Sequence, residues 1–224
     1  MKNLSNKKWK TFNNEQALIS GLVNEIVRIA NKKINDNDRF NIVITGGNSA
    51  LDIYKKFLTC ETDWGKWHIY LSDERCVPIG HSDRNDQMIN KVWLDKSPIP
   101  NKNIHFIKAE LGLSDAREDY ENTLKRIDKF DVVLLSMGED GHVASLFFNH
   151  AHLEEQMVVT EINSPKPPKE RISMSYQQLN KAHYVFKLII GESKQKAATL
   201  LLQNASLPIA RVNGDCDRVY HLKK

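Results

Sequence analysis

The order of hydrophobic and polar positions along the chain predicts strands that alternate with amphipathic helices. Apolar runs rich in β-branched residues indicate buried strands at 41–45, 67–71, 132–136 and 183–190. Between these runs, apolar residues recur at three- and four-residue spacing, which is typical of helices with one buried face. Because strands that alternate with helices form βαβ units, the pattern predicts an α/β fold with a mostly parallel central sheet.

The remaining elements follow from shorter or less regular patterns. Helices are expected at 14–33, 51–58, 82–94, 114–127 and from Gly191 through Leu202. Asn13 or Asn14 is the expected N-cap of the first helix, and Ser114 that of the fourth. Further short strands are expected at 104–107, 157–160, 171–175, 209–212 and 219–222. Without an internal repeat or a linker, we expect one α/β domain over residues 1–224, with a three-layer, Rossmann-like arrangement.

The charge balance excludes some partners. The chain has 32 Lys+Arg and 28 Asp+Glu, a net charge of +4, which is too small and too dispersed to indicate nucleic-acid binding. Lys7, Lys8 and Lys10 are interpreted as a solvated terminus. The sequence has neither a signal peptide nor an apolar run of membrane-spanning length, so we expect no membrane association. The oligomeric state stays open, with a monomer as the simplest expectation.

The cysteines indicate a reducing compartment. Cys60, Cys76 and Cys216 are odd in number, widely spaced and form no CxxC motif, so they suggest neither a disulfide framework nor a zinc site. A cytoplasmic protein is therefore expected.

The strongest candidate chemistry lies in residues 130–148. An apolar strand ends there in the turn 138–142, of sequence GEDGH, and ligands of open α/β sheets bind at the carboxyl ends of strands. His142, with the carboxylate of Asp140 two residues earlier, has the ingredients of an oriented general base. The alternative is a turn whose polar residues only satisfy backbone groups.

Four polar loops are expected at one edge of the sheet, because parallel strands share the edge at which they end. These loops are Gly46-Gly47-Asn48-Ser49, Asp73-Glu74-Arg75, Asp140-Gly141-His142 and Gly191–Lys194. In the first loop, the glycine pair allows the backbone to approach a ligand, and free N–H groups at the start of the next helix suit a phosphate. A simple strand-to-helix turn explains that loop equally well.

Three cations are candidate phosphate ligands. Lys194 lies in the first turn of a helix, where it opposes the helix dipole unless an anion binds; otherwise it is a surface lysine. Arg75 can bind phosphate with two hydrogen bonds or neutralise Asp73 or Glu74. Arg171, at the start of a predicted strand, has the same two interpretations.

Motifs of other chemistries are absent from the sequence. It contains no HExxH, GxSxG, GxGxxG or P-loop, and its eight histidines have no metal-ligand spacing, so no metal site is predicted. His68 and His183 lie in strand patterns and are expected to be core or edge residues. The residues alone therefore predict a phosphate-binding α/β pocket that faces one histidine base, without naming the substrate.

Four segments carry a resemblance to a known family. They are ITGGNS…LDIY, LSDERCVP…SDRN, FDVVLLSMGEDGHVASLF and RISMSYQQLNKA…VFKLIIGESKQKA. In order and spacing they resemble those of 6-phosphogluconolactonases, over roughly residues 15–215. The resemblance implies the fold shared with glucosamine-6-phosphate deaminases and ribose-5-phosphate isomerases. It also implies hydrolysis of the sugar-phosphate lactone 6-phosphoglucono-δ-lactone to 6-phosphogluconate, in the oxidative pentose phosphate pathway, without a metal or organic cofactor.

The same resemblance implies roles for individual residues. His142 matches the general base, Arg75 the arginine of the DER motif, and Lys194 the lysine of the GxxK turn. Arg171 matches the arginine that opens an RIT-like strand. The phosphate loop corresponds to Gly46, Gly47, Asn48 and Ser49. Asp73 is expected to contact the substrate beside Arg75, while Asp140 either orients His142 or caps the glycine turn.

The chain also departs from the family's usual motifs. The phosphate loop usually reads GGST-P, the strand before the histidine turn usually ends in glycine, the DSN motif has a small central residue, and proline follows SLF. The residues that differ are Asn48, Ser49, Ala50, Ser136, Arg84 and Phe148. Asn48 and Ser49 keep hydrogen-bonding side chains, so phosphate binding is expected to survive.

Two rival functions are less compatible with the sequence. The related deaminases place a glutamate five residues after the histidine, where this chain has Phe147, which cannot relay protons. A sugar-phosphate sensor without catalysis would need a DNA-binding domain, for which the residues before the first helix are too few.

Overall fold

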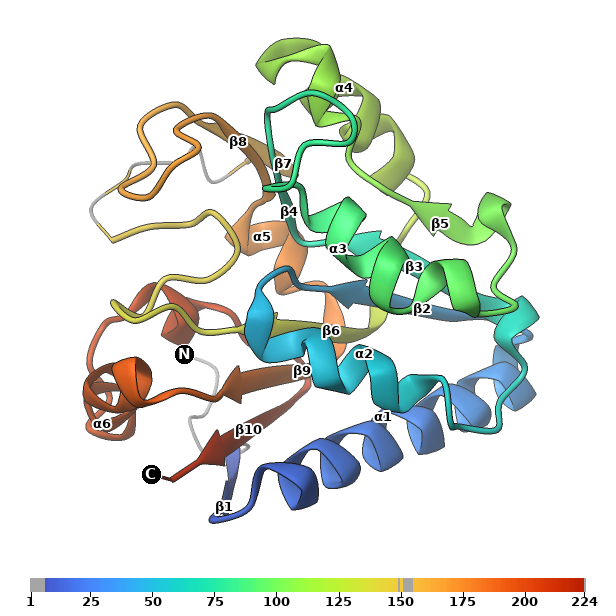
Figure 1. Ribbon diagram of the computed structural model, residues 1–224, viewed down its shortest axis with the longest axis vertical. Coiled ribbons are helices and arrows are strands. Elements are labelled where there is room, and N and C mark those ends of the chain that lie inside the picture. Colours follow the sequence, from blue (N-terminus) through green and yellow to red (C-terminus); the bar gives the residue numbers. More distant parts are fainter. Residues whose placement is uncertain (1–6, 149, 151–154, 224) are drawn as a thin grey trace.

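A seven-stranded parallel sheet forms the centre of the molecule, with strand order β1-β10-β9-β6-β2-β3-β5 (Figure 1). The computed structural model describes residues 7–148, 150 and 155–223. The strands are β1 (Lys7–Phe12), β2 (Phe40–Ile44), β3 (Trp67–Leu71), β5 (Ile104–His105), β6 (Phe130–Ser136), β9 (Ala182–Ile189) and β10 (Cys216–Leu222). The predicted α/β fold with a mostly parallel sheet is confirmed.

Helices cover both faces of this sheet. They are α1 (Glu15–Asn37), α2 (Leu51–Phe57), α3 (Asn85–Val92), α4 (Leu113–Leu124), α5 (Tyr176–Leu179) and α6 (Gln195–Leu202). Figure 1 shows α1, α2 and α3 on one side of the sheet and α4 and α5 on the other. The predicted cap of α1 is confirmed, because Asn14 accepts a 2.9 Å hydrogen bond from the backbone N–H of Ala17. Its apolar stripe is buried as the spacing predicts.

A second, antiparallel sheet lies beside the first, with strand order β4-β8-β7. Its strands are β4 (Asp73–Arg75), β8 (Arg171–Met174) and β7 (Val158–Glu161). We predicted residues 73–75 as a loop at the edge of the main sheet. Instead, the chain leaves β3 at Ser72 and continues as β4, because β8 supplies a partner strand for its backbone groups. Arg75 therefore projects from a strand that is held on one side.

Two further sequence expectations are wrong. Ser114 does not cap α4; the helix already begins at Leu113, and Gly112 occupies the cap position without a side-chain hydrogen bond. The expected strand at 209–212 is a 3-10 turn over Pro208–Arg211, and the N–H of Ile209 donates to the carbonyl of Gly141 at 3.0 Å. This turn therefore supports the GEDGH loop.

The N-terminal lysines also have a different setting from the one expected. We interpreted them as a solvated terminus, but residues 7–12 form β1, which pairs in parallel with β10 at the edge of the main sheet. Lysines are common on edge strands, where they discourage pairing with further strands, so the charges did not indicate a strand in the sequence. Trp9 and Phe12 anchor this strand against the core.

No helix in the described part of the chain is long and apolar enough to cross a membrane.

Candidate active site

A small cavity of about 170 Å³ opens at the carboxyl ends of β2, β6 and β9, beside the small sheet. Nine of the ten predicted site residues line it: Gly46, Gly47, Asn48, Ser49, Asp73, Arg75, His142, Arg171 and Lys194. The tenth, Asp140, lies behind His142. The structure therefore brings together five segments that are far apart in the sequence.

The turn after β6 holds His142 in place. The N–H of Gly138 donates to the carbonyl of His142 at 2.9 Å, and the N–H of Gly141 donates to the carbonyl of Gly138 at 3.1 Å. A Cβ at Gly138 would lie 2.1 Å from the Cε1 and Nδ1 atoms of His142, so the imidazole packs directly on the glycine backbone. Only glycine at position 138 allows the ring to lie at the end of the strand.

Asp140 fixes the orientation of the imidazole. Its Oδ1 atom lies 2.5 Å from Nδ1 of His142 and accepts the backbone N–H of the same residue at 3.1 Å. The hydrogen bond to His142 lowers the pKa of Asp140 well below its usual range, so the carboxylate is ionised. When Nδ1 donates to this carboxylate, Nε2 is the ring nitrogen that is left to accept a proton. Asp140 thus serves both as turn cap and as histidine partner.

The strand-to-helix turn after β2 lies against Asn85. A Cβ at Gly46 would be 1.9 Å from Oδ1 of Asn85, so this close approach requires glycine. Nδ2 of Asn85 donates to the carbonyl of Asp73 at 2.8 Å. The first α3 side chain therefore joins the phosphate-loop candidate to β4.

Lys194 enters the cavity from the turn after β9, although its helix begins one residue later. Its Nζ donates to Oγ of Ser49 at 2.9 Å and to Oγ of Ser136 at 3.1 Å. Burial lowers the pKa of Lys194 to about 8. Among the described residues no carboxylate forms an ion pair with it, so two hydroxyls alone hold the ammonium group.

Arg75 and Arg171 lie directly opposite each other in the β4–β8 ladder. Like charges at such positions destabilise an antiparallel pair unless an anion binds between them. Arg171 uses Nε and Nη2 on the carbonyls of Lys166, Pro167 and Pro168, at 2.9 to 3.3 Å. Burial lowers its pKa, and the charge of Arg75 acts in the same direction.

Arg75 does not neutralise its neighbours. Nη1 donates to the carbonyl of Asp83, and Nε is buried without a partner among the described residues. No ion pair joins Arg75 to Asp73 or Glu74 in the part of the chain that the structure describes. A buried N–H donor without an acceptor is costly, and a ligand anion would satisfy it.

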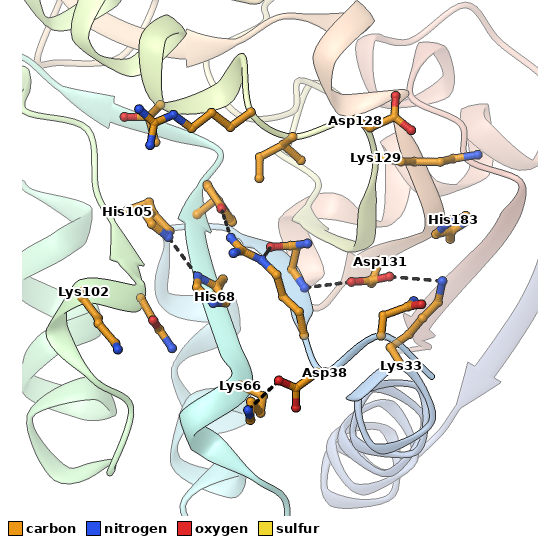
Figure 2. Close-up of a pocket in the computed structure, with 18 of the residues that line it drawn as sticks. Lys33, Asp38, Lys66, His68, Lys102, His105, Asp128, Lys129, Asp131 and His183 are labelled. Carbon is orange, nitrogen blue, oxygen red and sulfur yellow. Dashed lines mark hydrogen bonds and ion pairs between the residues drawn. The ribbon is translucent and has the colours of Figure 1, made fainter. Parts of the chain in front are cut away.

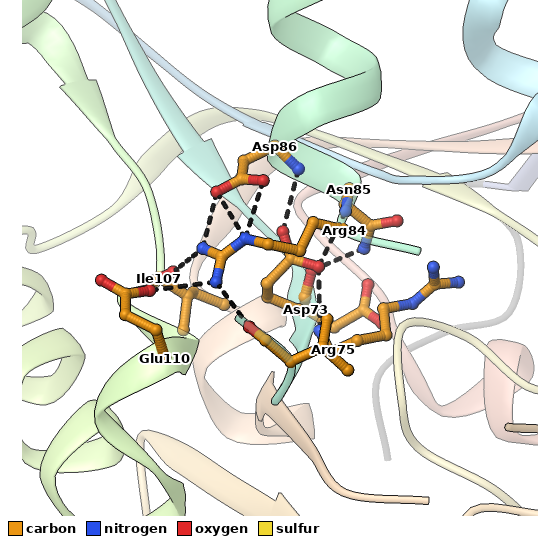
Figure 3. A network of polar contacts seen from close by, with 9 residues as sticks. Asp73, Arg75, Arg84, Asn85, Asp86, Ile107 and Glu110 are labelled. Atoms are coloured by element: carbon orange, nitrogen blue, oxygen red, sulfur yellow. Dashed lines mark hydrogen bonds and ion pairs between the residues drawn. The ribbon is translucent and has the colours of Figure 1, made fainter. Parts of the chain in front are cut away.

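A cluster of polar contacts around Arg84 fixes the loop that carries the carbonyl of Asp83, to which Arg75 donates. Nε and Nη2 of Arg84 donate to the carboxylate of Asp86 at 2.6 to 2.9 Å, and Nη1 donates to Glu110 at 3.0 Å. Figure 3 shows Asp86 and Glu110 around Arg84, while the guanidinium of Arg75 points away from the cluster. Arg84, which replaces a small residue of the usual motif, therefore anchors the segment that orients Arg75.

Glu74 connects this cluster to α3. Its carboxylate accepts the N–H groups of Asn85 and Asp86 at 2.8 and 2.9 Å, where a helix N-terminus favours negative charge. Burial raises the pKa of Glu74 to about 7, against the effect of these hydrogen bonds. Glu74 thus does not line the cavity, unlike its neighbours Asp73 and Arg75.

Two serine hydroxyls hold the carboxylate of Asp73 at the cavity wall. Its carboxylate accepts hydrogen bonds from the hydroxyls of Ser72 at 2.9 Å and Ser145 at 2.7 Å. Ser145 follows the GEDGH turn, so this contact ties β4 to the loop that carries His142.

Three polar residues of the cavity wall were not predicted as site residues: Thr45, Asn85 and Ser136. Asn85 and Ser136 contact other segments of the site. Each lies in a motif that we quoted for the family resemblance, but their roles depend on contacts with segments about forty and sixty residues away. Only the three-dimensional structure places Ser136 beside Lys194 and Asn85 beside Gly46.

Comparisons with known proteins identify the relatives of this chain. The family model for glucosamine-6-phosphate isomerases/6-phosphogluconolactonase matches residues 13–221. A 6-phosphogluconolactonase of Thermotoga maritima is 31% identical over 211 residues, which cover 94% of this chain and 96% of that protein. The chloroplastic 6-phosphogluconolactonase 3 of Arabidopsis thaliana is also 31% identical, over 97% of this chain and 74% of its own length.

The fold has a solved counterpart as well. A crystal structure of 6-phosphogluconolactonase from Thermotoga maritima superposes with a TM-score of 0.91 at 30% identity, and the match covers 97% of this chain and 100% of that one. The matches in sequence and in fold span almost the whole chain. The chain therefore belongs to the glucosamine-6-phosphate isomerase/6-phosphogluconolactonase family.

Proposed function

We propose that this protein hydrolyses 6-phospho-D-glucono-1,5-lactone to 6-phospho-D-gluconate, in the oxidative pentose phosphate pathway. The observation that carries the proposal is the contact between His142 and Asp140, because His142 lines one cavity with three cations that form no ion pair with a carboxylate among the described residues. Such a cavity offers a base at one end and anion-binding groups at the other.

The phosphate of the substrate supplies the binding energy. It docks on the N–H groups of the Gly46–Ser49 turn, with Arg75, Arg171 and Lys194 around it. These contacts are remote from the reacting carbon, and they hold the lactone carbonyl beside His142. The unpartnered Nε of Arg75 and the facing arginines support this placement, because an anion relieves both costs.

His142 acts as the general base on water. Nε2 takes a proton from water while the water oxygen attacks C1, and the carbonyl becomes a tetrahedral oxyanion. When the intermediate collapses, the bond from C1 to the ring oxygen breaks, and the imidazolium returns its proton to that oxygen. Asp140 stabilises the imidazolium between these two steps.

The chain offers donors for the oxyanion. A backbone N–H of the first loop or the guanidinium of an arginine stabilises it. One oriented base contributes roughly 10²–10⁴-fold, and a lactone is already reactive toward water, so base and positioning together are a sufficient set of catalytic groups.

The deaminase activity of related proteins is the nearest alternative. It requires an additional carboxylate where this chain has Phe147, a buried ring 4.9 Å from the imidazole of His142. On the same ring, Cζ of the Arg171 guanidinium lies 5.8 Å from the centre of Phe147. An apolar ring at this position supports hydrolysis rather than proton transfer between two carbons.

A direct assay separates the alternatives. Freshly prepared 6-phosphogluconolactone should be hydrolysed faster than its spontaneous rate, while glucosamine 6-phosphate should release no ammonia. Ammonia release at a comparable rate would favour the deaminase. Binding of 6-phosphogluconate without any lactone hydrolysis would favour a sensor.

The setting of the enzyme is part of the same proposal. We place it in the cytoplasm as a monomer that needs no cofactor. The three cysteines are free thiols, as a reducing compartment requires. Size-exclusion chromatography with light scattering tests the monomer.

A further inference from the structure

A hollow of about 1140 Å³ lies at the amino edge of the main sheet, opposite the candidate active site. The starts of β2, β3, β5 and β6 line it, together with the carboxyl-terminal ends of α1 and α4. Its size is that of a pocket for a whole small molecule rather than a single ion. None of the residues assigned to lactone hydrolysis belongs to it.

The sheet face that lines this hollow is polar. Asn41 in β2 is the register partner of His68 in β3, and Tyr70 in β3 is the partner of His105 in β5. On the opposite face, the same strands bury apolar side chains such as Trp67 without any exposure. A sheet face covered by a helix is normally apolar, so the polar residues mark a part of the face that α4 leaves open.

Arg39 is the central cation of the hollow. Nε donates to Oδ1 of Asn41 at 2.8 Å, and Nη2 donates to the hydroxyl of Tyr70 at 3.1 Å. A guanidinium has five N–H donors, so three remain unused by the described residues. No carboxylate in the part of the chain that the structure describes forms an ion pair with Arg39, although the group is half-buried.

His68 and His105 add neutral donors beside this cation. Nδ1 of His68 lies 3.2 Å from Nε2 of His105, and Figure 2 shows the two rings pointing toward each other. Burial is the main cause that lowers the pKa of His68 to about 4 and also lowers that of His105, with the charge of Arg39 acting in the same direction. Both rings are therefore uncharged at neutral pH, and Arg39 keeps its positive charge without a histidine cation beside it.

Most other charges of the hollow are ion-paired, including Lys129 with Asp215 and Asp119 with Lys108. Lys33 and Lys66 are held in ion pairs with Asp131 and Asp38, at 3.2 and 2.8 Å. By contrast, Lys102 and Arg126 at the rim have no ion-pair partner among the residues described, and Asp128 is exposed. The rim thus adds positive charge that a diffusing anion encounters before it reaches Arg39.

We propose that this hollow binds a small phosphorylated metabolite, with the phosphate on the free N–H donors of Arg39, which the buried hydroxyl of Tyr70 holds in place. A planar guanidinium matches a phosphate with two parallel hydrogen bonds, and Arg39 is already oriented by two neutral acceptors. The rest of the volume holds the organic part of the ligand, beside the face of His68. This proposal concerns a different edge of the sheet and does not depend on the lactonase activity.

The test uses the full chain with Lys194→Ala, which weakens phosphate binding at the candidate active site. Inorganic pyrophosphate is titrated while the imidazole NMR signals of His68 and His105 report on the hollow alone. We expect saturable shifts of both signals. Arg39→Ala in the same background should weaken this binding at least about tenfold, the loss expected for a charged hydrogen-bonding group.

Two further variants control for folding and for general charge. Tyr70→Phe keeps the packed ring and removes only the hydroxyl, so it should fold and bind about threefold more weakly. Arg28→Ala removes an exposed arginine outside the hollow and should bind as the Lys194→Ala parent does. Equal affinity of the Arg39→Ala and Arg28→Ala proteins would overturn the proposal.

The class of ligand is resolved by titrating AMP and ribose 5-phosphate in the same way. Tighter binding of AMP identifies a nucleotide that uses the ring face of His68, and tighter binding of ribose 5-phosphate identifies a sugar phosphate. If both bind no better than inorganic sulfate at the same ionic strength, the hollow only attracts anions in general and the proposal is wrong.

Discussion

At the carboxyl edge of the main sheet, the acceptors that the described residues offer to Arg75, Arg171 and Lys194 are carbonyls and hydroxyls. At the amino edge, by contrast, Lys33 and Lys66 each form an ion pair with a carboxylate. Neutral acceptors fix the direction of a cation and leave its charge for a ligand. A carboxylate partner consumes that charge. By this criterion Arg39 is the one residue of the amino edge among those described that resembles the three cations of the candidate active site.

The two edges also differ in how closely the backbone surrounds a ligand. The carboxyl edge is built on glycine turns, and at Gly46 and Gly138 side chains pack where a Cβ would stand. The amino edge is lined by side chains of strand faces and helix ends, around a volume several times larger. The cavity at the carboxyl edge therefore restricts the position of a ligand more than the hollow at the amino edge does.

Removal of His142, the proposed general base, is expected to have the largest effect on lactonase activity. His142→Ala should lower kcat by roughly 10²–10⁴-fold and leave the phosphate contacts intact, because only the proton acceptor is lost. Steady-state lactonase kinetics measure this, with thermal unfolding as the control for the fold. An Ala variant with near-native kcat would show that the carboxyl edge binds substrate without using His142.

A smaller loss is expected when a free cation is removed. Lys194→Ala should reduce kcat/KM for the phosphorylated lactone by roughly 10- to 100-fold, the value of a hydrogen bond to a charged group. Glucono-δ-lactone without phosphate should be a poor substrate of both proteins, and the substitution should hardly change its kcat/KM.

The matched variant for this comparison is Lys66→Ala, at the amino edge. Lys66 is already paired with Asp38, so its loss should leave lactone hydrolysis unchanged. Equal effects of the two substitutions would contradict the distinction between free and paired cations.

The lowered pKa of Lys194 predicts that lactonase activity declines at alkaline pH. Burial lowers the pKa of Lys194 to about 8, so its charge is present below that pH and is lost as the pH rises through it. The pH profile of kcat/KM reports groups of the free enzyme, so kcat/KM should fall above about pH 8, by up to tenfold per pH unit. Lys194→Arg keeps the charge and should remove this decline. Each rate is corrected for spontaneous lactone hydrolysis, and a decline that persists in Lys194→Arg would assign it to another group.

Much of this arrangement could be predicted from the sequence. The strand at 67–71 and the cap at Asn14 follow from local patterns, and the parallel sheet brings its loops to one edge by topology alone. The His142–Asp140 pair is a two-residue contact inside one turn, so its candidates were visible in the sequence. The roles given to the cations before the structure was known remain predictions.

The parts that failed depend on contacts at long range. Residues 73–75 form a strand only because β8 lies beside them, and the charged β1 is a strand only because β10 offers an edge. Ser136 also lacked any local signal, because its partner Lys194 is 58 residues away. Periodicity detects buried faces, but it does not report which distant segment satisfies a polar group.

The smallest predicted effect concerns Ser136, which stands where the family usually has glycine. Its hydroxyl accepts one of the two hydrogen bonds that orient Lys194, and the hydroxyl of Ser49 accepts the other. Ser136→Gly restores the usual residue and removes one neutral acceptor, a loss of about 0.5–1.5 kcal/mol. We expect KM for the phosphorylated lactone to increase about two- to tenfold, with little change in kcat.

The variant Ser136→Thr distinguishes a positioning role from a packing role. Threonine keeps the hydroxyl, so it should retain most of the affinity that glycine loses, and in the Lys194→Ala background neither substitution should alter KM further. An increase in KM that is the same with or without Lys194 would mean that Ser136 acts on the cavity wall itself. In that case the hydrogen bond between Ser136 and Lys194 would contribute nothing to phosphate binding. The rule that neutral acceptors keep a cation available for a ligand would then be supported by the contacts of Arg75 and Arg171 and by the bond from Lys194 to Ser49.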